Sequence, residues 1–188
     1  MKKLLALLLA VLLLLPLFAC GSRPRPAEDT RVVTDSLGRE VRLPAEIRHI
    51  AATGAMAQLV LFALCPDELA GLATDWDDTA KEYLDAQYYD LPVIGQLYGG
   101  KGNLNPETLL QSGAQVVIDV GEAKEGLADE LDTLQNQTGL PFVHISATLG
   151  TMGEAYRQLG AILGMQEKAE ALAAYCEATY ARITALSG

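Results

Sequence analysis

The segment LPVIGQLYGGKGNLNPETLLQSGAQVVID, residues 91–119, carries the pattern that decides the fold. It begins with a glycine-rich loop around Tyr98. Asn105 followed by Pro predicts a helix start, because Asn is a favoured N-cap and Pro is favoured at the first helical position. Residues 115–119 have three β-branched apolar residues at their centre and predict a short buried strand. A loop, a capped helix and a buried strand occur in ordinary connections, and in this order they also form the ligand edge of α/β sheets.

Strand and helix patterns alternate on both sides of this segment. Residues 31–43 predict a β-hairpin with Gly38 at its turn. Further strands are predicted at 47–52, 69–73 and 141–145, and helices at 55–65, 79–86, 125–137, 151–163 and 167–186, with capping boxes at Thr79 and Thr151. Strands that alternate with helices predict an α/β, Rossmann-like fold of three layers. Its sheet would be mostly parallel, preceded by the hairpin and followed by a long helix.

The carboxyl ends of the predicted strands would gather at one edge, where open α/β sheets bind ligands. At that edge Trp76 and Tyr98 would offer flat apolar surfaces, and Glu122 would offer a carboxylate. No GxSxG or HExxH motif is present and no Cys–His pair stands at a strand end, which disfavours an enzyme. The GGKG sequence at 99–102 lacks the spacing of a phosphate-binding loop.

The composition excludes some classes of partner. The formal net charge is -10 and no basic stretch is present, so nucleic acid is not expected to bind. His49 and His144 are the two histidines, and both fall at the start or middle of predicted strands. Structural side chains are the simplest interpretation of both, because a transition-metal site needs several such ligands at one point. No cofactor is expected.

The N-terminus has the pattern of a lipoprotein signal sequence. Two lysines precede an unbroken apolar run at 4–15, which is too short to span a bilayer comfortably. The sequence LFAC, ending at Cys20, resembles the lipobox of bacterial lipoproteins. That resemblance implies a signal peptide at 1–19 and a lipidated Cys20, followed by a flexible tether at 20–30. An uncleaved membrane anchor is the alternative, and both interpretations hold the protein at the extracytoplasmic face of the cell membrane.

Two further cysteines, Cys65 and Cys176, lie far apart in the sequence. An oxidising compartment would permit a disulfide between them, but their spacing does not require one. Both fall within apolar helical patterns, so we expect two buried free thiols.

From Val33 to Ile183 the sequence resembles the first lobe of class III substrate-binding proteins of ABC importers. This family captures vitamin B12, ferric siderophores and haem. The matching segments are VTDSLGREVRLP at 33–44, IRHIAATGAMAQLVLFAL at 47–64, ELAGLAT at 68–74, the whole of 91–119, and 141–183. The family has two similar lobes joined by a long helix. The resemblance therefore implies an N-terminal lobe at 31–166 and the start of the interlobe helix at 167–188, with the second lobe absent.

The resemblance also implies roles for residues at the predicted edge. Tyr98, with Gly99 and Gly100 beside it, stands where family members press an aromatic ring on the ligand. Trp76 lies in the other loop of this lobe that would reach the ligand. Glu122 is expected in the same ligand-binding wall from its place after a predicted strand, and not from the resemblance.

Two more residues have competing interpretations. Glu107 matches the lobe-surface glutamate that pairs with arginines of the permease subunits. An acid in the first turn of a helix is also favoured by the helix dipole, and the two interpretations are compatible. Met56 would supply a thioether to haem iron, although a core methionine near a helix start is the more common case.

These implications describe a lipid-anchored, extracytoplasmic receptor lobe of an ABC importer that binds its ligand without chemistry. A ferric siderophore or similar iron chelate is the first expectation, and a corrinoid or haem is the alternative. A small α/β enzyme and a lipoprotein with only an interaction role are the other classes. Because the chain ends at Gly188, it would be a fragment, a truncated gene product or a genuine one-lobe protein.

Overall fold

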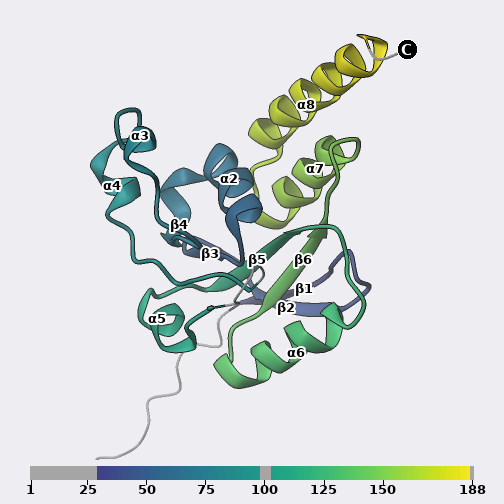
Figure 1. The fold of residues 1–188 in the computed structure, drawn as a ribbon. Helices are drawn as coiled ribbons and strands as arrows, with labels where there is room; N and C mark the ends of the chain where they lie inside the picture. Colours follow the sequence, from purple (N-terminus) through teal and green to yellow (C-terminus); the bar gives the residue numbers. More distant parts are fainter. Residues whose placement is uncertain (1–28, 98–102, 187–188) are drawn as a thin grey trace, which may run out of the picture.

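The computed structural model describes residues 29–97 and 103–186, which form three layers around a parallel sheet (Figure 1). The strands of the sheet are β3 (Ile50–Ala52), β4 (Leu69–Gly71), β5 (Val116–Gly121) and β6 (Phe142–Ser146). Their order is β4-β3-β5-β6, and all neighbouring pairs are parallel. The predicted α/β class and the mostly parallel sheet are therefore confirmed.

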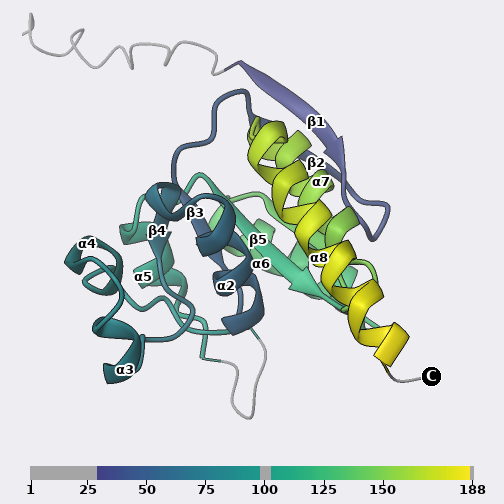
Figure 2. The same cartoon turned by 90° about the horizontal axis from the view of Figure 1, so that it is seen from above.

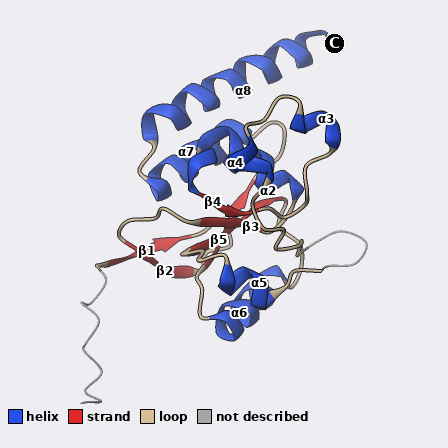
Figure 3. Ribbon diagram, turned by 90° about the vertical axis from the view of Figure 1, so that its left-hand side faces the viewer, coloured by secondary structure: helices blue, strands red, loops and turns tan. Residues whose placement is uncertain are grey.

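Helices cover both faces of the sheet (Figures 1 and 3). On one face lie α2 (Ala55–Leu64), α7 (Met152–Leu163) and α8 (Gln166–Leu186), and on the other lie α5 (Pro106–Gln111) and α6 (Leu127–Thr138). The 3-10 turn η2 (Pro66–Glu68) and the short helices α3 (Asp78–Lys81) and α4 (Ala86–Tyr89) complete the described elements. None of the helices in the described part of the chain is long and apolar enough to cross a bilayer.

The sheet divides the core into two parts because successive strand residues point to opposite faces. Ile118 and Val143 pack toward α2, α7 and α8, and both are fully buried. Val117 and Phe142 pack in the second cluster, with Leu131 of α6. A fully buried side chain of this size contributes about 1.5–3 kcal/mol, so both clusters stabilise the sheet substantially.

The hairpin of β1 (Thr30–Thr34) and β2 (Glu40–Pro44) covers the outer edge of β6. The Ser36 N–H donates to the His144 carbonyl at 2.9 Å, and the His144 N–H donates to Asp35 Oδ2 at 3.3 Å. Arg39 also donates to the Phe142 carbonyl at 3.1 Å. These bonds satisfy backbone groups that an open edge strand would leave unpaired.

The hairpin begins at the amino-terminal edge of the sheet. The Ala45 N–H donates to the Asp29 carbonyl at 2.7 Å. Asp29 and Gln115 line one hollow of the surface, and Gln115 immediately precedes β5. The polypeptide therefore enters the fold on the side away from the carboxyl ends of the strands.

Helix α8 packs along α7 and then extends beyond it (Figures 1 and 2). The approach is close at Gly160, where an added Cβ would lie 2.4 Å from the Ala169 Cβ. Arg157 joins the two helices through Glu170 at 2.7 Å and Glu177 at 2.5 Å. In the second half of α8 the large apolar side chains are exposed, and these are Tyr180, Ile183 and Leu186. Helix α8 is therefore packed against the core mainly in its first half, where Ala169 and Ala173 are buried.

Three local predictions were wrong. The strand predicted at 47–52 begins only at Ile50, because Gln115 Oε1 accepts the Arg48 N–H at 2.7 Å and the His49 N–H at 3.1 Å. The helix predicted at 79–86 is two short helices, and Asp77 rather than Thr79 caps the first by accepting the Ala80 N–H at 2.7 Å. The capping box at α7 does not form, because the Thr151 hydroxyl accepts the N–H of Thr148 at 2.9 Å instead.

Both cysteines in the described part of the chain are free, with Cys65 buried and Cys176 half-buried. Burial raises the pKa of the Cys65 thiol to about 12 and also raises the pKa of Cys176. We expect iodoacetamide at pH 8 to alkylate Cys176 at least about 10-fold faster than Cys65, because the thiolate is the nucleophile. Peptide mass spectrometry measures both rates. In urea the rates should converge, and equal rates in the folded protein would contradict the prediction.

Candidate ligand-binding edge

The carboxyl ends of β3, β5 and β6 bring two of the predicted site residues together. Gly121 pairs with Ser146 across β5 and β6, and the Ala147 N–H donates to the Gly121 carbonyl at 2.9 Å. The Met56 sulfur, in the first turn of α2, lies 4.0 Å from the position of a Cβ on Gly121. Met56 is 42% exposed, and Glu122, the residue after Gly121, is also exposed. Met56 and Glu122 therefore share one open edge.

The stems of the glycine-rich loop are tied to each other. Gln96 and Asn103 pair twice, because the Gln96 N–H donates to Asn103 Oδ1 at 2.9 Å and its carbonyl accepts the Asn103 N–H at 2.9 Å. Gly95 is required beneath them, with a φ of +97° and with the Asn103 carbonyl oxygen 2.2 Å from the position of an added Cβ. Only glycine fits there without moving backbone.

The same loop starts directly beside β3. The Leu97 N–H donates to the carbonyl of Thr53 at 2.7 Å, and Thr53 is the first residue after β3. Tyr98, Gly99 and Gly100 lie outside the described residues. Their predicted ligand contacts remain predictions, but the residues flanking them reach the candidate edge.

Trp76 is held in an aromatic cluster beside α2. Its indole N–H donates to the Tyr88 carbonyl at 3.1 Å, and its ring meets Phe62 edge-on at a centroid distance of 5.2 Å. The Tyr88 ring also meets Phe62 at 5.2 Å. Phe62 follows Met56 by about 9 Å along the helix axis, at 1.5 Å per residue. Trp76 is half-buried and lies to one side of the Met56 edge, where it secures the segment between β4 and α4.

Glu107 lies in the first turn of α5 and is exposed. The Asn105 side chain accepts the N–H groups of Glu107 at 2.9 Å and Thr108 at 3.1 Å, so the predicted N-cap is confirmed. The Asn105 N–H donates to the Ile94 carbonyl at 2.9 Å, which fixes the start of α5 to the chain that leads into the glycine-rich loop. Glu107 Oε1 accepts a bond from Gln111 at 3.3 Å.

A buried polar chain at the same edge was missed by the sequence analysis. Asp119 of β5 accepts hydrogen bonds from the Thr53 hydroxyl through Oδ1 and from His144 Nδ1 through Oδ2, the latter at 2.7 Å. His144 Nε2 lies 3.3 Å from the Ser146 hydroxyl. Thr53, Asp119 and His144 are buried, and Ser146 is half-buried. Polar residues at alternate positions of apolar strands were the available signal.

The sequence analysis disfavoured an enzyme because it found no catalytic motif at a strand end, and this polar chain bears on that argument. A serine, a histidine and an aspartate do stand in hydrogen-bond order at a strand end, although no sequence motif announces them. A metal site is not formed by the described residues, because no three His, Cys, Asp or Glu side chains among them converge.

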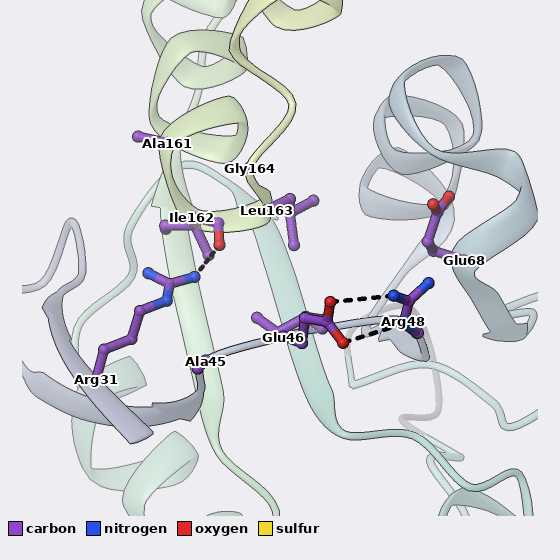
Figure 4. A pocket seen from close by; sticks show the side chains of 10 residues that line it. Arg31, Ala45, Glu46, Arg48, Glu68, Ala161, Ile162, Leu163 and Gly164 are labelled. Carbon is purple, nitrogen blue, oxygen red and sulfur yellow. Dashed lines mark hydrogen bonds and ion pairs between the residues drawn. The ribbon is translucent and has the colours of Figure 1, made fainter. Parts of the chain in front are cut away.

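A separate hollow of about 450 Å³ opens at the opposite edge, between the hairpin, η2 and α7 (Figure 4). Its two arginines are already engaged. Arg31 donates to the Ile162 carbonyl at the end of α7, and Arg48 pairs with Glu46 at 3.0 Å. This hollow contains none of the predicted site residues, and its guanidinium groups serve structural contacts.

No protein-family model matches the sequence, and no curated protein matches it. Solved structures do match. A solute-binding protein of an ABC transporter from Sulfurospirillum deleyianum has a TM-score of 0.68 at 19% identity, covering 79% of this chain and 46% of that chain. A periplasmic solute-binding protein from Veillonella parvula has a TM-score of 0.61 at 25% identity, covering 83% and 47%. SirA of Staphylococcus aureus, complexed with staphyloferrin B, has a TM-score of 0.55 at 18% identity, covering 76% and 45%.

The chain therefore has the fold of one lobe of an ABC transporter solute-binding protein. It spans about half the length of the solved structures that it matches. The resemblance read from the sequence is confirmed at the level of the fold. Other structures of this fold bind haem or molybdate, so the fold leaves the ligand unspecified.

Proposed function

We propose that the chain is the N-terminal lobe of a lipid-anchored, extracytoplasmic substrate-binding component of an ABC importer. It captures a ferric siderophore or similar iron chelate and delivers it to the permease. The observation that carries this proposal is the match of nearly the whole described chain to about half of several solute-binding proteins. The mechanism is binding without chemistry, and the lipid is attached at Cys20.

The proposed ligand wall combines residues from separate loops. Met56 and Glu122 stand at the carboxyl edge, and Trp76 approaches from the flank of α2. Tyr98, Gly99 and Gly100 are proposed to join them, because Leu97, which precedes them, is hydrogen-bonded to Thr53. Glu107, exposed at the start of α5, is proposed as the contact with the permease. Haem or a corrinoid is the second candidate ligand, and one observation favours haem. Met56 is 42% exposed at this edge, where its thioether would reach a ligand iron.

A single wall should bind weakly. Good ligand sites bury most of the ligand, and association costs several kcal/mol before contacts repay it. Two aromatic contacts contributing about 1–2 kcal/mol each sum to about 2–4 kcal/mol, which corresponds to a Kd of about 1 mM or weaker. A second lobe that closes the site should tighten binding by several orders of magnitude.

The purified chain should be titrated with haem, cyanocobalamin and a ferric trihydroxamate chelate, read by native mass spectrometry and by the fluorescence of Trp76, the only tryptophan. We expect one ligand to bind with a Kd on the order of 1 mM. Met56→Leu removes the thioether and should abolish a haem Soret shift. A chelate that meets Met56 mainly as apolar surface, which leucine also provides, should lose little affinity, and this difference separates the two candidates. No binding of any ligand at millimolar concentration would contradict the receptor function. Submicromolar binding by the monomer would contradict the one-wall argument.

A further inference from the structure

We propose that Ser146 is a ligand contact whose hydroxyl hydrogen is committed to His144, so that its oxygen only accepts a hydrogen bond from the ligand. The ligand would then present an N–H or O–H donor at this point. This inference rests on the proposed function and makes its ligand class narrower.

The position of Ser146 supports a ligand contact. It is the last residue of β6, at the carboxyl edge where open parallel sheets bind ligands. It is half-buried and pairs in register with Gly121. A Cβ on Gly121 would lie 4.0 Å from the Met56 sulfur. Its hydroxyl is therefore the outer end of a polar chain that begins in the core at Thr53.

The order of donors along that chain follows from Asp119. A carboxylate only accepts hydrogen bonds, so Thr53 donates to one of its oxygens and His144 Nδ1 carries the hydrogen that points at the other. A neutral imidazole has a single N–H, and the contact with Asp119 places it on Nδ1. His144 Nε2 is then an acceptor, and the Ser146 hydroxyl, 3.3 Å away, donates its only hydrogen to it.

The other described side chains at this edge, Met56 and Glu122, also offer hydrogen-bond acceptors. An ionised Glu122 accepts hydrogen bonds, and the Met56 sulfur is a weak acceptor. A ligand that faces Met56, Glu122 and Ser146 gains hydrogen bonds if it presents amide, ammonium or hydroxyl groups. A ligand that presents carboxylates meets only other acceptors at this edge. Its oxygens then find no donor there and lose the hydrogen bonds that they made to water. The edge therefore fits a chelate with amide or ammonium N–H groups better than a polycarboxylate chelate.

The proton order is tested by NMR of the protein labelled with ¹⁵N in its two histidines. Two-bond ¹H–¹⁵N correlations at pH 7.5 should show His144 as the neutral tautomer with hydrogen on Nδ1. The exposed His49 serves as the internal reference. A proton on His144 Nε2, in either the other tautomer or an imidazolium, would overturn the inference.

The ligand contact is tested with a matched pair of gallium(III) trihydroxamate chelates, one with a free ammonium group and one with that amine succinylated to a carboxylate. Chemical-shift titration measures millimolar affinities of both. The ammonium form should bind more tightly, and Ser146→Ala should weaken it about 10-fold, the effect of about 1.4 kcal/mol for one hydrogen bond to a charged group. Ser146→Thr should largely preserve binding. Ser112→Ala is the control, because that hydroxyl donates to the Leu109 carbonyl at the far end of α5.

The outcomes separate the two proposals. No binding of either chelate to the wild type would overturn the iron-chelate function, and the inference with it. Equal binding by wild type and Ser146→Ala, or tighter binding of the carboxylate form, would overturn the inference alone. Labelling of Ser146 by a fluorophosphonate would also overturn it, because a serine that attacks phosphorus is acting as a nucleophile and not as a fixed acceptor.

Discussion

Gly95→Ala is expected to lower the free energy of unfolding by about 3 kcal/mol or more. The φ of +97° at Gly95 is strained for any residue with a Cβ, which costs about 1–3 kcal/mol. The added Cβ would also lie 2.2 Å from the carbonyl oxygen of Asn103 and 3.1 Å from the Leu104 Cα. Both obstacles belong to the backbone, so relief requires the two stems of the glycine-rich loop to separate.

Gly113→Ala is the matched control for this change. Gly113 has a φ of +75°, but nothing lies within 4 Å of its added Cβ. Its replacement should cost about 1 kcal/mol, so the difference between the two variants reports mainly the collision, with a smaller part from the larger φ at Gly95. Urea unfolding, followed by Trp76 fluorescence and circular dichroism, gives both values. Equal losses would show that the stems are not held as closely as the structure places them.

Asp119→Ala should have the second large effect, a loss of about 3–5 kcal/mol. The substitution removes the carboxylate that accepts from both the Thr53 hydroxyl and His144 Nδ1. Two buried donors are then left without an acceptor. Each unsatisfied buried donor costs about 1–3 kcal/mol. Asp119→Asn keeps one acceptor oxygen and should fall between alanine and the wild type.

Asp132→Ala provides the control on the same face of the sheet. Asp132 pairs with Arg39 at 2.8 Å, but its side chain is 55% exposed, so its loss should cost less than about 1 kcal/mol. Urea midpoints of the variants, compared at equal denaturant slopes, report the differences. A loss of less than 1 kcal/mol for Asp119→Ala would mean that the buried chain contributes little to stability.

The fold was largely predictable because its signals are local. The apolar run that became β5 and the Asn-Pro start of α5 need no information from distant residues. The prediction of the strand at 47–52 failed because a distant side chain intervened. Gln115 accepts the N–H groups of Arg48 and His49, and no pattern within residues 47–52 reveals that this side chain will delay the strand.

The candidate edge was predictable only in part, for the same reason. Met56 and Glu122 are recognisable because strand ends can be located in the sequence. The chain from Thr53 to Ser146 depends on the register of β5 against β6, which places Asp119 opposite His144. Neither strand specifies that register by itself. The aromatic cluster of Trp76 likewise depends on how the segment before α4 folds back onto α2.

The entry of the chain at Asp29, on the edge opposite to the ligand wall, limits how an anchored lobe can stand on its membrane. Residues 20–29 reach at most about 35 Å when fully extended. A lobe of this size measures about 40 Å across. If lipid is attached at Cys20 as proposed, this reach is shorter than the lobe, so the lobe would have to tilt toward the membrane before Glu107 met a permease there. Tether length would then govern which orientations the receptor samples and how often a loaded lobe meets its transporter.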